Sequence, residues 1–249
     1  MSPEISVVIP VYNEAGNLRP LLRRLAAVLS RLGRPAEVLV VNDGSTDGTA
    51  VEIAAVAGEV AGLRELRLPS QSGQAHALWV GLQAAAGGYI VTLDGDGQDD
   101  PEDIPLLLAA VAKGEADLAC GWRVDRQDTR LRRAMSALAN AVRRGVLRDG
   151  LHDAGCQLRV FRRAVGGVMR PGTLMQTFLP ALAVAAGFRV REYPVRHHAR
   201  RHGASHYGLA QLWWRPAVAL VAVAWRLRRE RRARFARSGT GRGRRGATP

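Results

Sequence analysis

The chain has few cysteines and no clustered set of them. Cys120 and Cys156 are the only two in 249 residues. Two isolated cysteines offer neither the ligand spacing of a zinc site nor a disulfide framework. We therefore expect both to be reduced thiols in a cytoplasmic protein.

From the sequence we expect neither a cleaved signal peptide nor a membrane-spanning helix. The N-terminus MSPEISVVIP has no basic segment ahead of an apolar one. Near the C-terminus the apolar run PAVALVAVAW has ten residues, preceded by Arg215. As a helix it would be about 15 Å long, against a hydrocarbon core of about 30 Å. Such a run is too short to span a bilayer.

Acidic and basic residues are divided between the two halves. Residues 1–121 hold 16 Asp and Glu against 8 Lys and Arg, whereas the remainder supplies a net charge of +22. The first half therefore suits metal ions and the second suits anions. We expect residues 209–235 to form an amphipathic helix on an anionic membrane surface, and 236–249 to be a disordered basic tail.

Apolar runs alternate with helical patterns along residues 5–121. Since 47% of the residues are hydrophobic, one large α/β core is expected. This alternation predicts a mainly parallel sheet with helices on both faces. The expected strands are 5–9, 36–42, 63–68, 89–94 and 116–121. The expected helices are about 14–32, one that follows the stretch DGSTDGTA and ends near residue 60, 73–86 and 101–113.

Polar residues follow three of these strands. In parallel sheets ligands bind outside the carboxyl ends of the strands, so the residues there are candidates for a site. Pro10, Tyr12 and Glu14 follow the first strand, Asp43 the second and the stretch DGDGQDD, 94–100, the fourth.

Four interpretations of this acidic stretch compete. A solvated loop is the commonest fate of a charge run. An EF-hand loop counted from Asp94 would need Gly and Glu where Asp99 and Pro105 stand, so that interpretation fails. A helix cap before Pro101 explains residues 99–103. It leaves Asp94 and Asp96, an Asp-x-Asp pair that can hold a divalent cation bridging to two phosphates.

Three motifs together resemble the family 2 glycosyltransferases. They are VVIPVYNE (7–14), VVNDGSTDGT (40–49) and IVTLDGDGQDDPED (90–103). The resemblance implies the GT-A fold, a nucleotide-sugar-binding domain over residues 1–208. Further stretches at 121–140, 153–163 and 178–208 look like the polyprenol-phosphate sugar synthases of the dolichol-phosphate-mannose type.

The resemblance implies roles for particular residues. Those expected to line the nucleotide-sugar pocket are Pro10, Tyr12, Glu14, Asp43 and Asp94. Asp96 and Gln98, with Asp94 close by, would hold Mg²⁺ or Mn²⁺. Arg123, Arg132 and Ser136 would meet the acceptor phosphate, and Arg200, Ser205 and His206 would close over the donor phosphates.

Each of these residues also has a purely structural interpretation. Glu14 can be a helix-start acid, Asp43 a turn residue and Asp47 an N-cap. In addition, the family's usual His-Arg-Phe-Leu-Pro reads Gln-Thr-Phe-Leu-Pro at 176–180. That departure puts the acceptor or the activity in question.

The implied reaction needs no general base. A phosphate monoester is already mostly anionic at neutral pH, so it can attack the sugar in line and invert the anomeric centre. The expected function is transfer of mannose or glucose from a GDP- or UDP-linked sugar to polyprenyl phosphate, at the inner face of the cell membrane. The alternatives are a non-lipid acceptor, or a non-catalytic basic adaptor for membranes or nucleic acid; no nucleic acid partner is expected.

Overall fold

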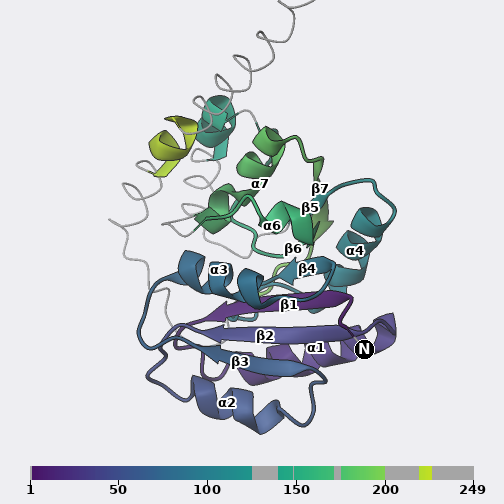
Figure 1. Ribbon diagram of the computed structural model, residues 1–249, viewed down its shortest axis with the longest axis vertical. Helices are drawn as coiled ribbons and strands as arrows, with labels where there is room; N and C mark the ends of the chain where they lie inside the picture. Colours follow the sequence, from purple (N-terminus) through teal and green to yellow (C-terminus); the bar gives the residue numbers. More distant parts are fainter. Residues whose placement is uncertain (1, 125–139, 148, 171–174, 200–218, 226–249) are drawn as a thin grey trace, which may run out of the picture. The chain divides into compact units, whose positions relative to one another are not determined.

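The computed structural model describes residues 2–124, 140–147, 149–170, 175–199 and 219–225 (Figure 1). The chain divides into two compact units, Met1–His206 and Tyr207–Pro249. Of the second unit, residues 219–225 are described, and they are helical. Within the described part of the chain, no helix has both the length and the apolarity needed to cross a bilayer.

A seven-stranded sheet forms the centre of the described part of the first unit, in the order β3-β2-β1-β4-β6-β5-β7. Neighbouring strands are parallel except around β6, which runs antiparallel to both β4 and β5. The bounds are β1 Ile5–Val11, β2 Ala36–Asn42, β3 Leu63–Arg67, β4 Tyr89–Thr92, β5 Leu118–Arg123, β6 Arg159–Arg162 and β7 Val190–Val195.

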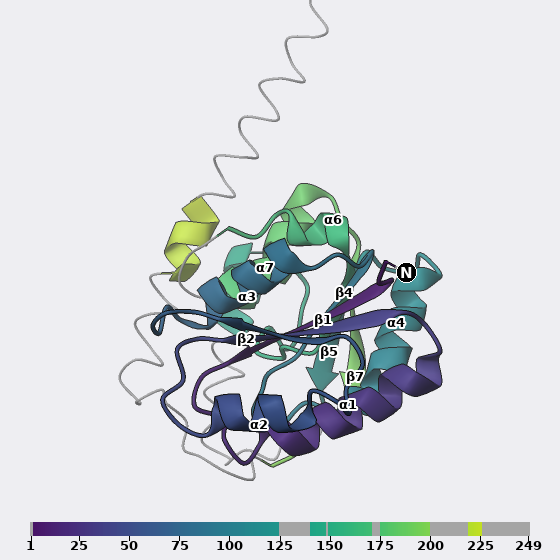
Figure 2. The ribbon, with the colours of Figure 1, turned by 60° about the horizontal axis from the view of Figure 1, so that its bottom comes forward.

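Helices cover both faces of this sheet (Figure 2). They are α1 Leu18–Leu32, α2 Thr49–Val56, α3 Gln74–Ala84, the 3-10 turn η1 Pro101–Asp103, α4 Ile104–Ala112, α6 Arg163–Gly166 and α7 Met175–Ala186. Residues 140–147 are also helical. A mainly parallel sheet with helices on both faces is therefore confirmed.

Side chains alternate along β1 between two apolar layers. Val7 and Ile9 belong to the buried cluster formed with α1, α2 and α4. Val8 points the other way, toward α3, where a Cβ on Gly81 would lie 2.3 Å from a Val8 methyl carbon. Glycine at this point lets α3 lie directly on the sheet.

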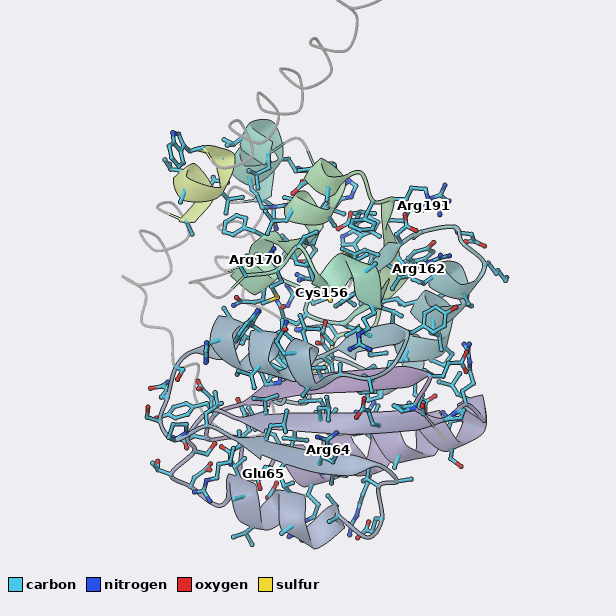
Figure 3. All side chains as sticks on the ribbon, in the orientation of Figure 1. Arg64, Glu65, Cys156, Arg162, Arg170 and Arg191 are labelled. Carbon is cyan, nitrogen blue, oxygen red and sulfur yellow. The ribbon has the colours of Figure 1, made fainter. Side chains whose placement is uncertain are left out.

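The outermost strand, β3, is shielded by charge. Arg64 and Glu65 are both exposed on it (Figure 3). Charged side chains on an edge strand discourage pairing with a second molecule.

Both cysteines, Cys120 and Cys156, are buried thiols, as expected of reduced cysteines. Burial raises the pKa of Cys120 to about 12.

Several expected element boundaries were wrong, and three of them bear on the site. β1 continues through Pro10 to Val11, because it stays in register with β2 up to Val11 and Asn42; Pro10 is thus within the strand. β4 ends at Thr92, two residues before Asp94. The first helix begins at Leu18 rather than near Glu14, for a reason seen in the loop before it.

Candidate active site

The strand ends bring most of the described candidates to one edge of the sheet. β1, β2, β4 and β5 are mutually parallel, so Tyr12, Asp43, Asp94 and Arg123 all follow or end strands at that edge. The end of β7 joins them, since Asp99 forms an isolated bridge with His197. Arg132, Ser136, Arg200, Ser205 and His206 lie outside the described residues.

Hydrogen bonds to side-chain acceptors connect the loop after β1 to the loop and helix after β2. Backbone N–H groups of residues 13–16 donate, in order, to Ser45 Oγ, Thr49 Oγ1, Asp47 Oδ2 and Glu52 Oε1, at 2.7–3.0 Å. These bonds fix the backbone beside Tyr12 and Glu14. Gly16 adopts a left-handed φ of 88°, which is outside the α-helical range, so α1 starts later than its sequence pattern suggests.

Asn13 completes this joint between the two loops. It adopts a left-handed φ of 54°, and its Oδ1 accepts from Thr46 N at 2.9 Å. Asn tolerates that conformation better than most residues. Glu14, in turn, accepts from Asn17 Nδ2 at 2.9 Å, so its structural role lies in the loop rather than in the first helical turn.

Asp43 is buried and holds the start of α3. Its two carboxylate oxygens accept from Ser72 N at 2.7 Å and Gly73 N at 2.8 Å. Gly44 allows the close approach, because φ is 70° and a Cβ there would meet Ser70 backbone carbon at 2.7 Å. The visible role of Asp43 is therefore structural, and its contact with a nucleotide stays a prediction.

Three carboxylates crowd the loop after β4. Burial, followed by the charges of Asp96 and Asp99, raises the pKa of Asp94 well above its ordinary value. Burial and Asp96 likewise raise the pKa of Asp99 to about 6. Two hydrogen bonds order the loop, from Gln98 N to Asp96 Oδ1 at 3.1 Å and from Asp94 N to Asp99 Oδ2 at 3.4 Å.

Asp100 has a different role from these acids. Its Oδ1 caps η1 by accepting from Glu102 N at 3.0 Å, as the capping interpretation expected. Burial alone would raise its pKa, but hydrogen bonds from His198 and Glu102 N and the charges of Arg24 and Arg196 bring the pKa below its ordinary value. The cap and these cations anchor the acidic loop to α1 and to the segment after β7.

The carboxylates after β4 suit a divalent cation that also binds a ligand. Mg²⁺ and Mn²⁺ prefer oxygen ligands, and a cation would relieve the repulsion that raises these pKa values. Among the described residues, no three His, Cys, Asp or Glu side chains come together to enclose a metal ion. A cation held by Asp96, Gln98 and Asp94 would thus take further oxygens from bound phosphates.

Arg123 is already paired in this structure. Its Nε and Nη2 donate to the two oxygens of Asp153 at 2.7 and 2.9 Å. An acceptor phosphate would have to share or displace this carboxylate, so contact between Arg123 and the acceptor stays a prediction.

Two further polar residues near Asp94 were not predicted. Gln74 Nε2 donates to Asp94 Oδ1 at 2.6 Å, and Arg159 is fully buried at the start of β6. No motif marked Gln74, which is simply the first residue of a predicted helix. Arg159 lies in the stretch 153–163 that carried part of the resemblance, but nothing in that stretch indicated burial.

Comparison with known proteins identifies the family. Residues 6–166 match the family model Glycosyl transferase family 2. The chain belongs to this family. Among curated relatives of this glycosyltransferase, dodecaprenyl-phosphate galacturonate synthase of Rhizobium johnstonii is 36% identical over 231 residues, which cover 91% of this chain and 68% of the relative.

A second relative acts on a similar lipid but a different sugar, by its name. Undecaprenyl-phosphate 4-deoxy-4-formamido-L-arabinose transferase of Edwardsiella ictaluri is 39% identical over 210 residues, covering 84% of this glycosyltransferase and 64% of the relative. The chain thus spans about two thirds of the length of these curated relatives.

Solved structures confirm the GT-A fold of this glycosyltransferase. Glucosyl-3-phosphoglycerate synthase from Mycobacterium tuberculosis, in complex with Mg²⁺ and uridine diphosphate, has a TM-score of 0.66 at 20% identity, covering 89% of this chain and 79% of that one. TarS 1–349 of S. aureus, in complex with UDP-GlcNAc, has a TM-score of 0.62 at 17% identity, covering 89% and 66%.

Proposed function

We propose that this glycosyltransferase moves a sugar from a nucleoside diphosphate to polyprenyl phosphate, with the help of Mg²⁺ or Mn²⁺. The main support is that two relatives covering most of the chain are both named for a polyprenyl phosphate. The acidic loop after β4 supports the donor half of the reaction, since its crowded carboxylates suit a cation bound to a diphosphate.

Acidic and basic residues of the chain would have different roles in the reaction. A divalent cation at Asp96, Gln98 and Asp94 would neutralise the departing diphosphate. Pro10, Tyr12, Glu14 and Asp43, at the ends of β1 and β2, would line the pocket for the nucleoside. Arg123, Arg132 and Ser136 would orient the acceptor phosphate, while Arg200, Ser205 and His206 would cover the donor phosphates. In-line attack by the acceptor oxygen would then invert the anomeric centre.

The sequence-based expectation named mannose or glucose as the donor sugar. The two relatives are named for galacturonate and for 4-deoxy-4-formamido-L-arabinose, and neither name supports mannose or glucose. Two structural neighbours were solved in complex with uridine diphosphate or UDP-GlcNAc, so UDP-linked sugars are the donors to try first.

The acceptor places the reaction at a membrane surface. We propose that residues 209–235 lie in the interface of an anionic bilayer and that the catalytic unit, residues 1–208, stays on its cytoplasmic face. The basic balance of the second half of the chain supports this arrangement, because anionic headgroups attract clustered arginines.

The test is a screen of radiolabelled UDP- and GDP-sugars against polyprenyl phosphate in vesicles, with extraction of the lipid product. Our proposal predicts that one donor yields a metal-dependent, lipid-extractable glycosyl phosphate. Nucleoside diphosphate release that requires a water-soluble acceptor would favour a family 2 enzyme with a non-lipid acceptor. No turnover with any donor would favour the adaptor.

A further inference from the structure

A chain of hydrogen bonds, part-buried at Asp94 and buried at Arg159, links α3 to α7. Gln74 Nε2 donates to Asp94 Oδ1 at 2.6 Å, and Gln176 Nε2 donates to Gln74 Oε1 at 3.2 Å. Arg159 then donates from Nη1 to the backbone carbonyl of Gln176 and from Nη2 to that of Ala154 at 2.9 Å. Both Arg159 and Gln176 are buried, at 1% and 3% exposure.

Both glutamines are held in place by other parts of the fold. Gln74 is the first residue of α3, and the two backbone N–H groups before it are bound by Asp43. Gln176 lies in the first turn of α7, where Arg159 of β6 binds its carbonyl. The two side chains therefore meet because Asp43 and Arg159 fix the helices that bear them.

The hydrogen bonds run in one direction along the whole chain. Gln74 turns its NH₂ group toward Asp94 Oδ1 and its Oε1, which can only accept, toward Gln176. Gln176 must then present its own NH₂ group to that Oε1. The remaining atom, Gln176 Oε1, is buried without a hydrogen-bond partner among the described residues.

That unpaired oxygen indicates a functional reason for the arrangement. A buried carbonyl without a partner destabilises a fold, and an apolar side chain at position 176 would avoid the penalty. What the glutamine supplies instead is an N–H that keeps Gln74 directed at Asp94. The donors are neutral amides. They orient the carboxylate but leave its negative charge in place, whereas an arginine or lysine would neutralise it.

We propose that Gln74 and Gln176 are positioning residues for the nucleotide sugar, holding Asp94 by Oδ1 so that Oδ2 serves the donor or its cation. This rests on the proposed function of the acidic loop. It also gives a role to the first position of the departure at 176–177: Gln176 stands where the family usually has His and supplies an N–H donor to Gln74.

The test is calorimetric titration of the full-length protein with UDP and Mn²⁺, together with thermal unfolding of each variant. Gln176→Glu keeps the shape but removes the N–H, and Gln176→Met removes both polar atoms. Each should weaken UDP binding about ten-fold, because Gln74 loses the N–H that directs its own hydrogen bond at the Asp94 carboxylate. Gln176→Met should nevertheless unfold at the same temperature as the wild type or higher, since it removes the unpaired oxygen.

Two further comparisons separate positioning from a general effect. Gln83→Glu places the same change on an exposed position of α3 and should leave UDP binding unaltered. Gln176→His, which retains an N–H donor, should bind UDP more tightly than Gln176→Glu. Because Gln176 acts through Gln74, the double variant Gln74→Met/Gln176→Met should lose no more affinity than Gln74→Met alone.

The outcomes distinguish this proposal from the proposed function. If Gln176→Glu and Gln176→Met both bind UDP as tightly as the wild type, the positioning role is overturned. It is also overturned if Gln176→Met loses UDP affinity only in step with a loss of thermal stability. If the wild type binds neither UDP nor GDP with Mn²⁺, the donor site itself is wrong and the positioning role fails with it.

Discussion

Asp99 gives the metal-free protein an unfavourable charge. Burial and the neighbouring Asp96 raise its pKa to about 6, whereas an unfolded chain has an Asp pKa near 3.9. The folded state thus binds this proton more tightly. Ionising Asp99 favours unfolding, and the penalty accumulates as the pH rises from about 4 to about 6.

Asp99→Asn should therefore stabilise the protein in chelator at neutral pH and not at acidic pH. The two proteins should be equally stable at pH 4, and the variant should gain up to about 3 kcal/mol by pH 7, seen as a midpoint several degrees higher. Thermal unfolding from pH 4 to 8 measures this difference.

Asp117→Asn is the control with the opposite sign. The hydrogen bond with Arg189 lowers the pKa of Asp117. The Asp117→Asn variant should therefore be less stable than the wild type above pH 4. A constant difference between Asp99→Asn and the wild type across the range would show that Asp99 is not held protonated by its surroundings.

Residues at strand ends could be predicted because their position follows from chain order alone. Asp43, Asp94 and Asp96 each follow an apolar run, and parallel strands carry such residues to one edge. Gln74 and Asp153 could not be predicted, because their partners lie 20 or more residues away in the sequence. Arg159 could not be predicted because nothing in its local sequence indicates burial. Gln74 and Gln176 are 102 residues apart, and no local pattern relates them.

At the scale of elements, the joint between the first two loops depends on acceptors from α2. Glu52 accepts from Gly16 N at 2.7 Å and from Arg19 N at 3.1 Å. Glu52→Ala should cost about 1–3 kcal/mol, since it leaves two N–H groups without their acceptor. It should also weaken nucleotide binding, because the loop bearing Tyr12 and Glu14 loses its fixed backbone.

Urea unfolding and UDP titration would measure both effects. Glu59→Ala is the matched control, because Glu59 forms only an exposed ion pair with Arg23, and such pairs contribute little. If the two variants behave alike, the Glu52 bonds do not hold this loop.

Most elements were predictable from apolar periodicity, and the exceptions have physical causes. The start of α1 was misplaced because Gly16, in the loop held by side chains from the loop and helix after β2, has a left-handed backbone that interrupts the helical pattern. No strand was predicted after residue 121, so the antiparallel strand β6, which pairs with β4 and β5, and the edge strand β7 were both missed. Such pairing is a property of the folded sheet and leaves no local periodicity.

At the scale of the whole molecule, the two halves differ in charge. Figure 3 labels Arg162, Arg170 and Arg191, three of the arginines in the basic half. Seven of the ten arginines between Arg226 and Arg245 lie between Arg226 and Arg237. On an anionic bilayer each would contribute about 1 kcal/mol at low salt, screened within roughly 8 Å at physiological ionic strength.

Liposome binding should therefore weaken with salt without disappearing, because buried Trp and Leu surface is insensitive to salt. Truncation after Tyr207, beside the boundary between the two units, should leave a nucleotide-binding protein that glycosylates vesicle-embedded acceptor poorly. Sedimentation with anionic liposomes at low and high salt compares the two. Interfacial binding would be contradicted if the full-length protein stays in the supernatant at low salt. It would also be contradicted if high salt and alkaline carbonate fail to extract the protein from the liposomes.

The central claim is that the acidic loop after β4 holds a cation that activates a sugar donor for transfer to polyprenyl phosphate. The most direct measurement is the rate of lipid-linked product formation by wild type, Asp96→Asn and Glu115→Gln, each with Mn²⁺ and with chelator. Glu115 is exposed at the opposite edge of the sheet, just before β5. We predict that Asp96→Asn and chelator each lower the rate by orders of magnitude, that Glu115→Gln leaves it unchanged, and that Asp96→Asn unfolds near the wild-type temperature. Full turnover by Asp96→Asn with Mn²⁺, or by the wild type in chelator, would contradict the account.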